Sequence, residues 1–162
     1  MNPDEDDKYA EGKDDRPLRG YILLMSTYGA VVGALTLLLR RRKTLPQLGL
    51  GDLALIAVAT HKLSRVVTKD SITSPLRAPF VTYVEPAGAG EVNEKVRVGG
   101  AAHAVGELLM CPLCVDVWVA TGFVGASAFA PRATRMAASV FAIGAVSNAL
   151  HFAWDALKKV DE

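Results

Sequence analysis

Three long stretches of the sequence carry almost no charge, and they constrain the fold more than any other feature. Residues 21–39 and 136–154 contain no formally charged side chain, and residues 108–130 contain only Asp116. About 20 helical residues, rising about 1.5 Å each, cross the roughly 30 Å hydrocarbon core of a bilayer. The sequence therefore predicts an all-α membrane protein with at least three transmembrane helices, the last two forming a hairpin over 108–154.

A fourth segment, residues 52–68, leaves the number of spans at three or four. Asp52 is predicted to cap its amino end, and residues 53–59 are fully apolar. That run is shorter than a usual span, although the long basic side chains after it could reach back to the membrane surface. The segment is expected to be either a spanning helix or an amphipathic helix in the plane of the membrane surface.

The N-terminal part is expected to be an acidic tail followed by a membrane anchor. Residues 1–19 are rich in acids and poor in large apolar side chains, so disorder is expected there. Residues 20–43 are predicted to be a retained transmembrane helix, because the basic run 40–43 stands where a cleaved signal peptide would have small residues. Within this helix, Gly29 and Gly33 form a small-xxx-small pair that would let another helix pack closely.

Residues 69–107 form a polar loop between the apolar stretches. The β-prone runs 81–84 and 92–98 flank a segment rich in glycine and alanine, which predicts a small β-hairpin within the loop. Two prolines favour an ordered but irregular conformation over 71–80, and a tight turn is predicted at 131–135.

The distribution of basic residues predicts which side of the membrane this loop faces. Ten Lys and Arg residues lie between Arg40 and Glu107, and cytoplasmic loops are enriched in these residues. If residues 52–68 do not span, the amino terminus is outside; if they span, both termini are inside. In both arrangements the 69–107 loop and the carboxyl terminus face the cytoplasm of a bacterial cell.

Cys111 and Cys114 are the only cysteines in the chain, and Pro112 between them fits the first turn of a helix. Their position near a helix amino terminus would favour a reactive thiolate, which allows a thiol-redox role. A zinc site is a second possibility, because His103 and Glu107 fall on the same helix face and all four are zinc ligands. The favoured reading is a reduced pair that packs at the membrane surface, with no cofactor.

Other polar residues near the membrane are expected to bind lipid or to pair with one another. A basic stripe could hold anionic lipid headgroups or serve as an anchor; its members are Lys62, Arg65, Lys69 and Arg77. Asp116 lies inside a spanning helix, so it is expected to pair with Arg65 or Arg77. Asn148 and His151 are expected to make hydrogen bonds between helices.

Several short motifs resemble a known family. They are ATHKLSR at 59–65, KDSIT at 69–73, LRAPF at 76–80, GELLMCPLC at 106–114 and VWV at 117–119. Over about residues 50–157, they resemble the small bacterial multi-pass membrane proteins called domain of unknown function 1360. The matching positions are Arg65, Asp70, Arg77, Pro79, Phe80, Glu107, Cys111, Cys114 and Trp118.

The resemblance implies a multi-pass protein without an established activity, to which the tail and first helix look like an amino-terminal addition. His103 lies outside the pattern, which weakens the four-ligand zinc hypothesis. Clustering of the matching residues suggests that the loop folds back on the entrance of the cysteine-bearing helix. Asp70, Pro79, Phe80, Asp116 and Trp118 are assigned structural roles.

No nucleophile, base and oxyanion-stabilising set is recognisable in the sequence, which favours a non-enzymatic protein. The leading hypothesis is a membrane anchor or scaffold whose cytoplasmic loop binds a protein or lipid. The alternative is a metal-binding or thiol-redox membrane protein that uses Cys111 and Cys114. Lipids and either a protein partner or a second copy are the expected partners; the net charge of +1 gives no reason to expect nucleic acid.

Overall fold

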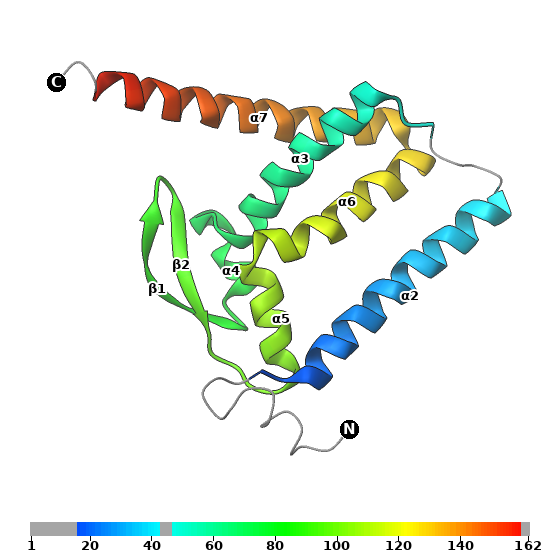
Figure 1. Ribbon diagram of the computed structural model, residues 1–162, viewed down its shortest axis with the longest axis horizontal. Helices are drawn as coiled ribbons and strands as arrows, with labels where there is room; N and C mark the ends of the chain where they lie inside the picture. The colour runs from blue at the N-terminus through cyan, green and yellow to red at the C-terminus, as the bar shows by residue number, and fades with distance from the viewer. Residues whose placement is uncertain (1–15, 43–46, 160–162) are drawn as a thin grey trace. The chain divides into compact units, whose positions relative to one another are not determined.

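The computed structural model describes residues 16–42 and 47–159, which are mainly helical (Figure 1). The elements in chain order are α2 (Leu18–Arg42), α3 (Leu50–Thr68), the 3₁₀ helix η1 (Ser71–Thr73), α4 (Ser74–Arg77), β1 (Val81–Gly88), β2 (Glu91–Val96), α5 (Ala101–Met110), α6 (Pro112–Phe129) and α7 (Pro131–Lys158). Most of the predicted tail, residues 1–15, and Lys43 of the basic run lie outside the described residues.

The described chain divides into two compact units. The first unit comprises residues 16–38 and 65–115, and the second comprises 39–42, 47–64 and 116–159. The first therefore contains the hairpin, α4, α5 and most of α2. The second contains most of α3, most of α6 and all of α7.

Three described helices are long and apolar enough to cross a bilayer: Leu18–Arg41, Pro112–Phe129 and Pro131–Lys158. In the most apolar stretch of each helix, the share that is buried by the rest of the chain is only 6%, 17% and 6%, in the same order. Apolar surface left uncovered to this extent is what a lipid environment would cover. Helix α3 does not reach this combination of length and hydropathy, in keeping with the doubt about residues 52–68.

The predicted second and third spans differ from the observed helices at their ends. Residues 108–130 are not one helix: α5 ends at Met110, Cys111 is extended (φ −103°, ψ 104°), and α6 begins at Pro112. A proline disfavours helical geometry in the residue before it, which explains the break. The turn predicted at 131–135 is wrong, because Pro131 opens α7 as a first-turn proline and Thr134 N–H donates to the Ala130 carbonyl.

In the second unit, small side chains let α3, α6 and α7 approach closely. Ala59 of α3 and Ala138 of α7 are fully buried and form a core with Ile56 and Phe123. Around them pack Leu48, Leu55, Leu63, Val119 and Phe141.

Two polar contacts join α3 to α7 in this unit. In the amide orientation that satisfies both groups, Asn148 Oδ1 accepts a hydrogen bond from Lys62 Nζ at 2.9 Å, as expected for an interhelical role of Asn148. At the other end of α3, Arg135 Nε donates to Asp52 Oδ1 at 3.0 Å. Asp52 lies in the first turn rather than at the predicted cap, and it accepts the Gly49 N–H at 3.3 Å.

The Asp52–Arg135 contact predicts a pH-dependent stability. The hydrogen bond from Arg135, followed by that from the Gly49 backbone, lowers the pKa of Asp52 below its usual value. A carboxyl whose pKa is lower when folded stabilises the fold above its ordinary pKa of about 3.9, and this stabilisation is lost as the pH falls through the lowered value. Acidification from about pH 5 to about pH 3 is therefore expected to lower the thermal midpoint of the wild type in detergent more than that of Asp52→Asn. Parallel pH profiles of the two proteins would contradict this assignment.

In the first unit, the predicted hairpin is confirmed. Strands β1 and β2 pair antiparallel from Val81 opposite Val96 to Gly88 opposite Glu91, with two register irregularities. Gly88 and Gly90 at the turn have positive φ angles of 121° and 82°, which glycine adopts without strain. Residues 71–77, predicted as irregular, instead form η1 and α4, with Pro75 in the first turn of α4.

Among the glycines of α2, Gly20 lies against another helix of the same unit. A Cβ atom at Gly20 would lie 2.8 Å from the Ala104 Cβ of α5 and 3.2 Å from the Ala101 Cα. At Gly29 and Gly33, a Cβ would meet nothing within 4 Å among the described residues. Within the described ranges, Gly20 is therefore the glycine at which α2 packs against α5.

Candidate functional site

The centre of the first unit is the guanidinium group of Arg77, which is fully buried. Its Nε donates to Glu94 of β2 at 2.6 Å, and the Glu94 side chain is only 5% exposed. The remaining donors reach the end of α3 and the η1–α4 segment; their acceptors are the Val67 carbonyl (2.7 Å), Thr73 Oγ1 (2.7 Å), the Asp70 carbonyl (3.1 Å) and Ser74 Oγ (3.2 Å). Every N–H of this buried cation therefore has an acceptor, which is the condition for burying a charge.

A second ion pair holds the turn end of the hairpin. Arg65, in the last turn of α3, donates through Nε and Nη2 to Glu91, with the shortest contact at 2.6 Å. Its side chain is 41% exposed, so this pair is weaker than the buried one. Two backbone hydrogen bonds hold the same end of the hairpin: the Val92 N–H donates to the Lys69 carbonyl, and the Ser71 N–H donates to the Gly90 carbonyl. We call Arg65, Arg77, Glu91 and Glu94 the arginine clamp.

The arginine clamp shows where two residues of the predicted basic stripe lie. Arg77 is fully buried, and Arg65, although 41% exposed, is paired with Glu91. The guanidinium groups predicted to neutralise Asp116 bind Glu91 and Glu94 instead. The physical reason is that carboxylates on β2 offer these arginines partners within the same unit.

The sequence reasoning missed Glu91 and Glu94. The only signal was a pair of acids three residues apart on a β-prone run that follows two arginines. Strand alternation would not have placed both acids against the arginines, because residues three apart on a regular strand point to opposite faces.

The remaining motif residues hold the hairpin to α5. Pro79 and Phe80 present their carbonyls to Arg97, whose Nη2 and backbone N–H donate at 3.3 Å and 3.0 Å. Gly106 of α5 lies under the hairpin, since a Cβ there would be 2.9 Å from a methyl of Val96 and 3.5 Å from the Phe80 Cβ. Trp118 is half-buried in α6.

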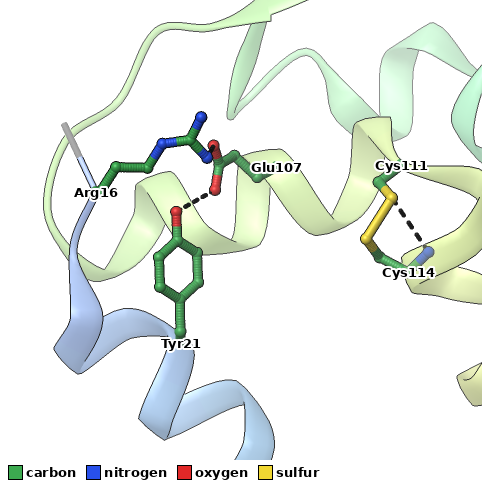
Figure 2. The surroundings of a disulfide bond; sticks show 5 residues. All are labelled: Arg16, Tyr21, Glu107, Cys111 and Cys114. Carbon is green, nitrogen blue, oxygen red and sulfur yellow. Dashed lines mark hydrogen bonds and ion pairs between the residues drawn. A yellow bond between two sulfur atoms is a disulfide. The ribbon is translucent and has the colours of Figure 1, made fainter. Parts of the chain in front are cut away.

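Glu107 joins the N-terminal helix to the rest of the unit (Figure 2). Its carboxylate accepts hydrogen bonds from Arg16 Nη1 at 3.0 Å and from the Tyr21 hydroxyl of α2. His103 Nε2, one turn earlier on α5, lies 3.6 Å from the same carboxylate, and Nδ1 of its ring lies 3.1 Å from the Val98 carbonyl. In Figure 2 the carboxylate points to Arg16 and Tyr21, away from the cysteines.

Cys111 and Cys114 are joined by a disulfide, whereas the sequence favoured a reduced pair. The extended conformation of Cys111 makes it the residue that caps α6, and a side chain in that position folds over the first turn. Its Sγ accepts the Cys114 backbone N–H at 3.2 Å, and the two Cα atoms are 5.2 Å apart, within the range that a disulfide bridges.

The predicted zinc ligands are not assembled into one site. His103 and Glu107 share a face as predicted, and the two cysteines meet, but the pairs do not converge. Among the residues that the structure describes, no group of three or more His, Cys, Asp or Glu side chains could hold a metal ion. In the disulfide, moreover, neither sulfur is the thiolate that zinc binds.

In the part of the chain that the structure describes, these features define a mainly helical protein with three helices able to span a membrane and an ion-paired hairpin between the first and second of them in sequence. The chain belongs to the family described as protein of unknown function DUF1360, which matches residues 55–154. The resemblance inferred from the motifs is therefore confirmed, and α2 precedes the matched region, as expected for an addition.

Among curated proteins, the chain is similar to the sporulation protein YjcA of Bacillus subtilis (strain 168). The two are 28% identical over 99 residues, which cover 59% of this chain and 84% of that protein. No solved structure matches the chain significantly. The family and this relative thus assign no ligand or reaction to any residue described above.

Proposed function

We propose that this protein is a non-enzymatic membrane scaffold whose 69–107 segment binds a protein partner on the cytoplasmic side. The observation that carries the proposal is the arginine clamp, which fixes an exposed hairpin to α3 and α4 through a buried, fully hydrogen-bonded arginine. A surface held rigid in this way binds without a large ordering cost. The name of the Bacillus relative refers to sporulation, and a scaffold in a membrane is compatible with that name.

Strand β1 is the surface proposed for the partner. Only Val81 of its eight residues is buried, and the neighbouring side chains of Tyr83 and Val84 are 56% and 50% exposed. In the described part of the chain, β1 pairs with β2 alone, so its other edge has backbone groups free to pair. An extended segment of a partner can add to such an edge.

A protein partner is favoured over lipid headgroups because most residues of the predicted basic stripe already have acceptors within the chain. Arg77 is buried, Arg65 is bound to Glu91, and Lys62 donates to Asn148. Three of the four cations that would attract anionic lipid thus have acceptors within the chain. The apolar side chains on β1 offer contacts that a polar lipid headgroup does not use.

The cytoplasmic orientation rests on the positive-inside rule. With spans at 18–41, 112–129 and 131–158, the loop after the first span contains eight Lys and Arg residues, and Arg40 and Arg41 lie at the end of the span that adjoins it. This is the three-span arrangement, which has the amino terminus outside.

Two lysine substitutions test the proposed surface. Val84→Lys places a charge on β1, and Asn93→Lys places the same charge on an exposed position of β2. Affinity purification of the full chain from native membranes in mild detergent is expected to recover a defined protein with the wild type and with Asn93→Lys. Recovery with Val84→Lys is expected to fall at least about tenfold, which corresponds to about 1.4 kcal/mol of binding free energy. Equal recovery with both variants, or no stable protein partner with the wild type, would refute the proposal.

A further inference from the structure

The disulfide between Cys111 and Cys114 closes a segment of only four residues. The stabilisation that a disulfide gives by restricting the unfolded chain grows with the length of the loop it closes, so a bridge this short stabilises the fold less than a long-range one. The first unit is already held by the arginine clamp and by Glu107. Stabilisation of the fold is therefore a poor explanation for the Cys111–Cys114 disulfide.

The geometry around Cys111 favours the thiolate that forms when the bridge opens. The Cys114 N–H, which donates to Cys111 Sγ at 3.2 Å, belongs to the first turn of α6. A backbone donor and the positive end of a helix dipole both stabilise a negative sulfur at this position. Glu107, one turn before Cys111, would oppose this charge, but its carboxylate is turned toward Arg16 and Tyr21 (Figure 2).

Both sulfurs belong to residues that a partner can reach. Cys114 is exposed and Cys111 is half-buried, and the Leu113 side chain between them is 80% exposed. The apolar span of α6 begins at Pro112, so the pair lies at one end of that span, where the chain would leave the hydrocarbon.

From this geometry we infer that Cys111 and Cys114 form a redox-active disulfide that oxidises a dithiol of a protein partner. A partner thiolate attacks Cys111 Sγ, a mixed disulfide forms, and the bond to Cys114 breaks; Cys114 leaves as a thiolate and takes a proton from water. The second partner thiolate then attacks the partner's own sulfur in the mixed disulfide and releases the Cys111 thiolate. Two electrons pass from the partner to the cysteine pair, and the partner gains a disulfide.

This activity goes beyond the proposed scaffold, because it needs neither the β1 edge nor a stable complex. Disulfides that occur on the cytoplasmic side of a membrane are usually transient and either catalytic or redox-sensing. The proposed orientation therefore agrees with an exchanging bridge rather than a permanent one.

The first test uses the wild-type full chain in mild detergent and glutathione as the probe. The protein is equilibrated without denaturant in mixtures of reduced and oxidised glutathione, quenched with acid, and labelled with a maleimide to count free thiols. The pair is expected to pass reversibly from disulfide to dithiol as the reduced fraction rises. A bridge that stays closed in excess reduced glutathione until the protein is denatured would overturn the inference.

The second test separates the two cysteines. With oxidised glutathione, Cys114→Ser is expected to form a mixed disulfide on Cys111 at least about tenfold faster than Cys111→Ser forms one on Cys114. Equal rates would overturn the role given to Cys111. If either variant fails to fold, the wild-type equilibrium decides the question by itself, and neither result depends on partner binding at β1.

Discussion

Replacement of Arg77 by leucine is expected to destabilise the first unit by about 3–5 kcal/mol, because Glu94 would remain buried without its cation. The Glu94 side chain is 5% exposed, so water cannot replace the lost donors. The acceptors of Thr73, Ser74 and two backbone carbonyls would lose their donor as well. The measurement is the free energy of unfolding of the full chain in mixed micelles, with hydrogen exchange of the hairpin amides as the readout for the first unit.

Two further variants separate the buried charge from simple loss of packing. The double variant Arg77→Leu/Glu94→Leu is expected to recover much of the loss, since removing both charges leaves no uncompensated ion. Arg65→Leu is the matched control, because it breaks a half-exposed Arg–Glu pair on the same hairpin and is expected to cost at most about 1 kcal/mol. Equal losses for Arg77→Leu and Arg65→Leu would show that burial of the first pair has no energetic importance.

The second large effect is expected at Gly20, where α2 meets α5. In Gly20→Ala the new methyl would lie 2.8 Å from the Ala104 Cβ and 3.2 Å from the Ala101 Cα, so the two helices must separate. Overpacking of this kind costs about 1–3 kcal/mol. Gly29→Ala, in the same helix with nothing within 4 Å, should be neutral or slightly stabilising because alanine favours the helix.

The difference between the two alanine variants can be measured by denaturant titration in micelles, with protection of Tyr21 from modification as a local readout. Loss of protection at Tyr21 in Gly20→Ala would report that its hydrogen bond to Glu107 has opened. If Gly29→Ala destabilised as much as Gly20→Ala, the important packing surface of α2 would be the one facing away from α5.

Features that depend on the solvent or on local chemistry were predictable from the sequence. The three long apolar helices follow from hydropathy, since a bilayer requires a continuous apolar stretch of about 20 residues. The hairpin follows from β-prone runs around glycines, and the start of α6 follows from Pro112. Helix ends were less predictable: one extended residue, Cys111, divides the helix expected at 108–130.

Features that depend on which side chains meet were not predictable. The basic residues near α3 looked like a lipid-binding stripe because Glu91 and Glu94, the acceptors of Arg65 and Arg77, lie 26 and 17 residues further along the chain on β2. The close approach of the two sulfurs was also not predictable, since it depends on the extended conformation of Cys111, which places its sulfur over the first turn of α6. The packing role of Gly20 was not predictable because its neighbour in the structure, Ala104, is 84 residues away in the sequence.

The arginine clamp also has a consequence for the order in which the chain assembles during synthesis. Arg77 reaches Val67 across 10 residues and Glu94 across 17, and Arg65 reaches Glu91 across 26. Contacts this close in sequence form early and quickly, so the hairpin can be secured while α6 and α7 are still emerging from the ribosome. The link from Arg16 to Glu107 spans 91 residues and must wait for α5. The N-terminal helix, although made first, is therefore expected to join this unit only after the hairpin has been secured by the arginine clamp.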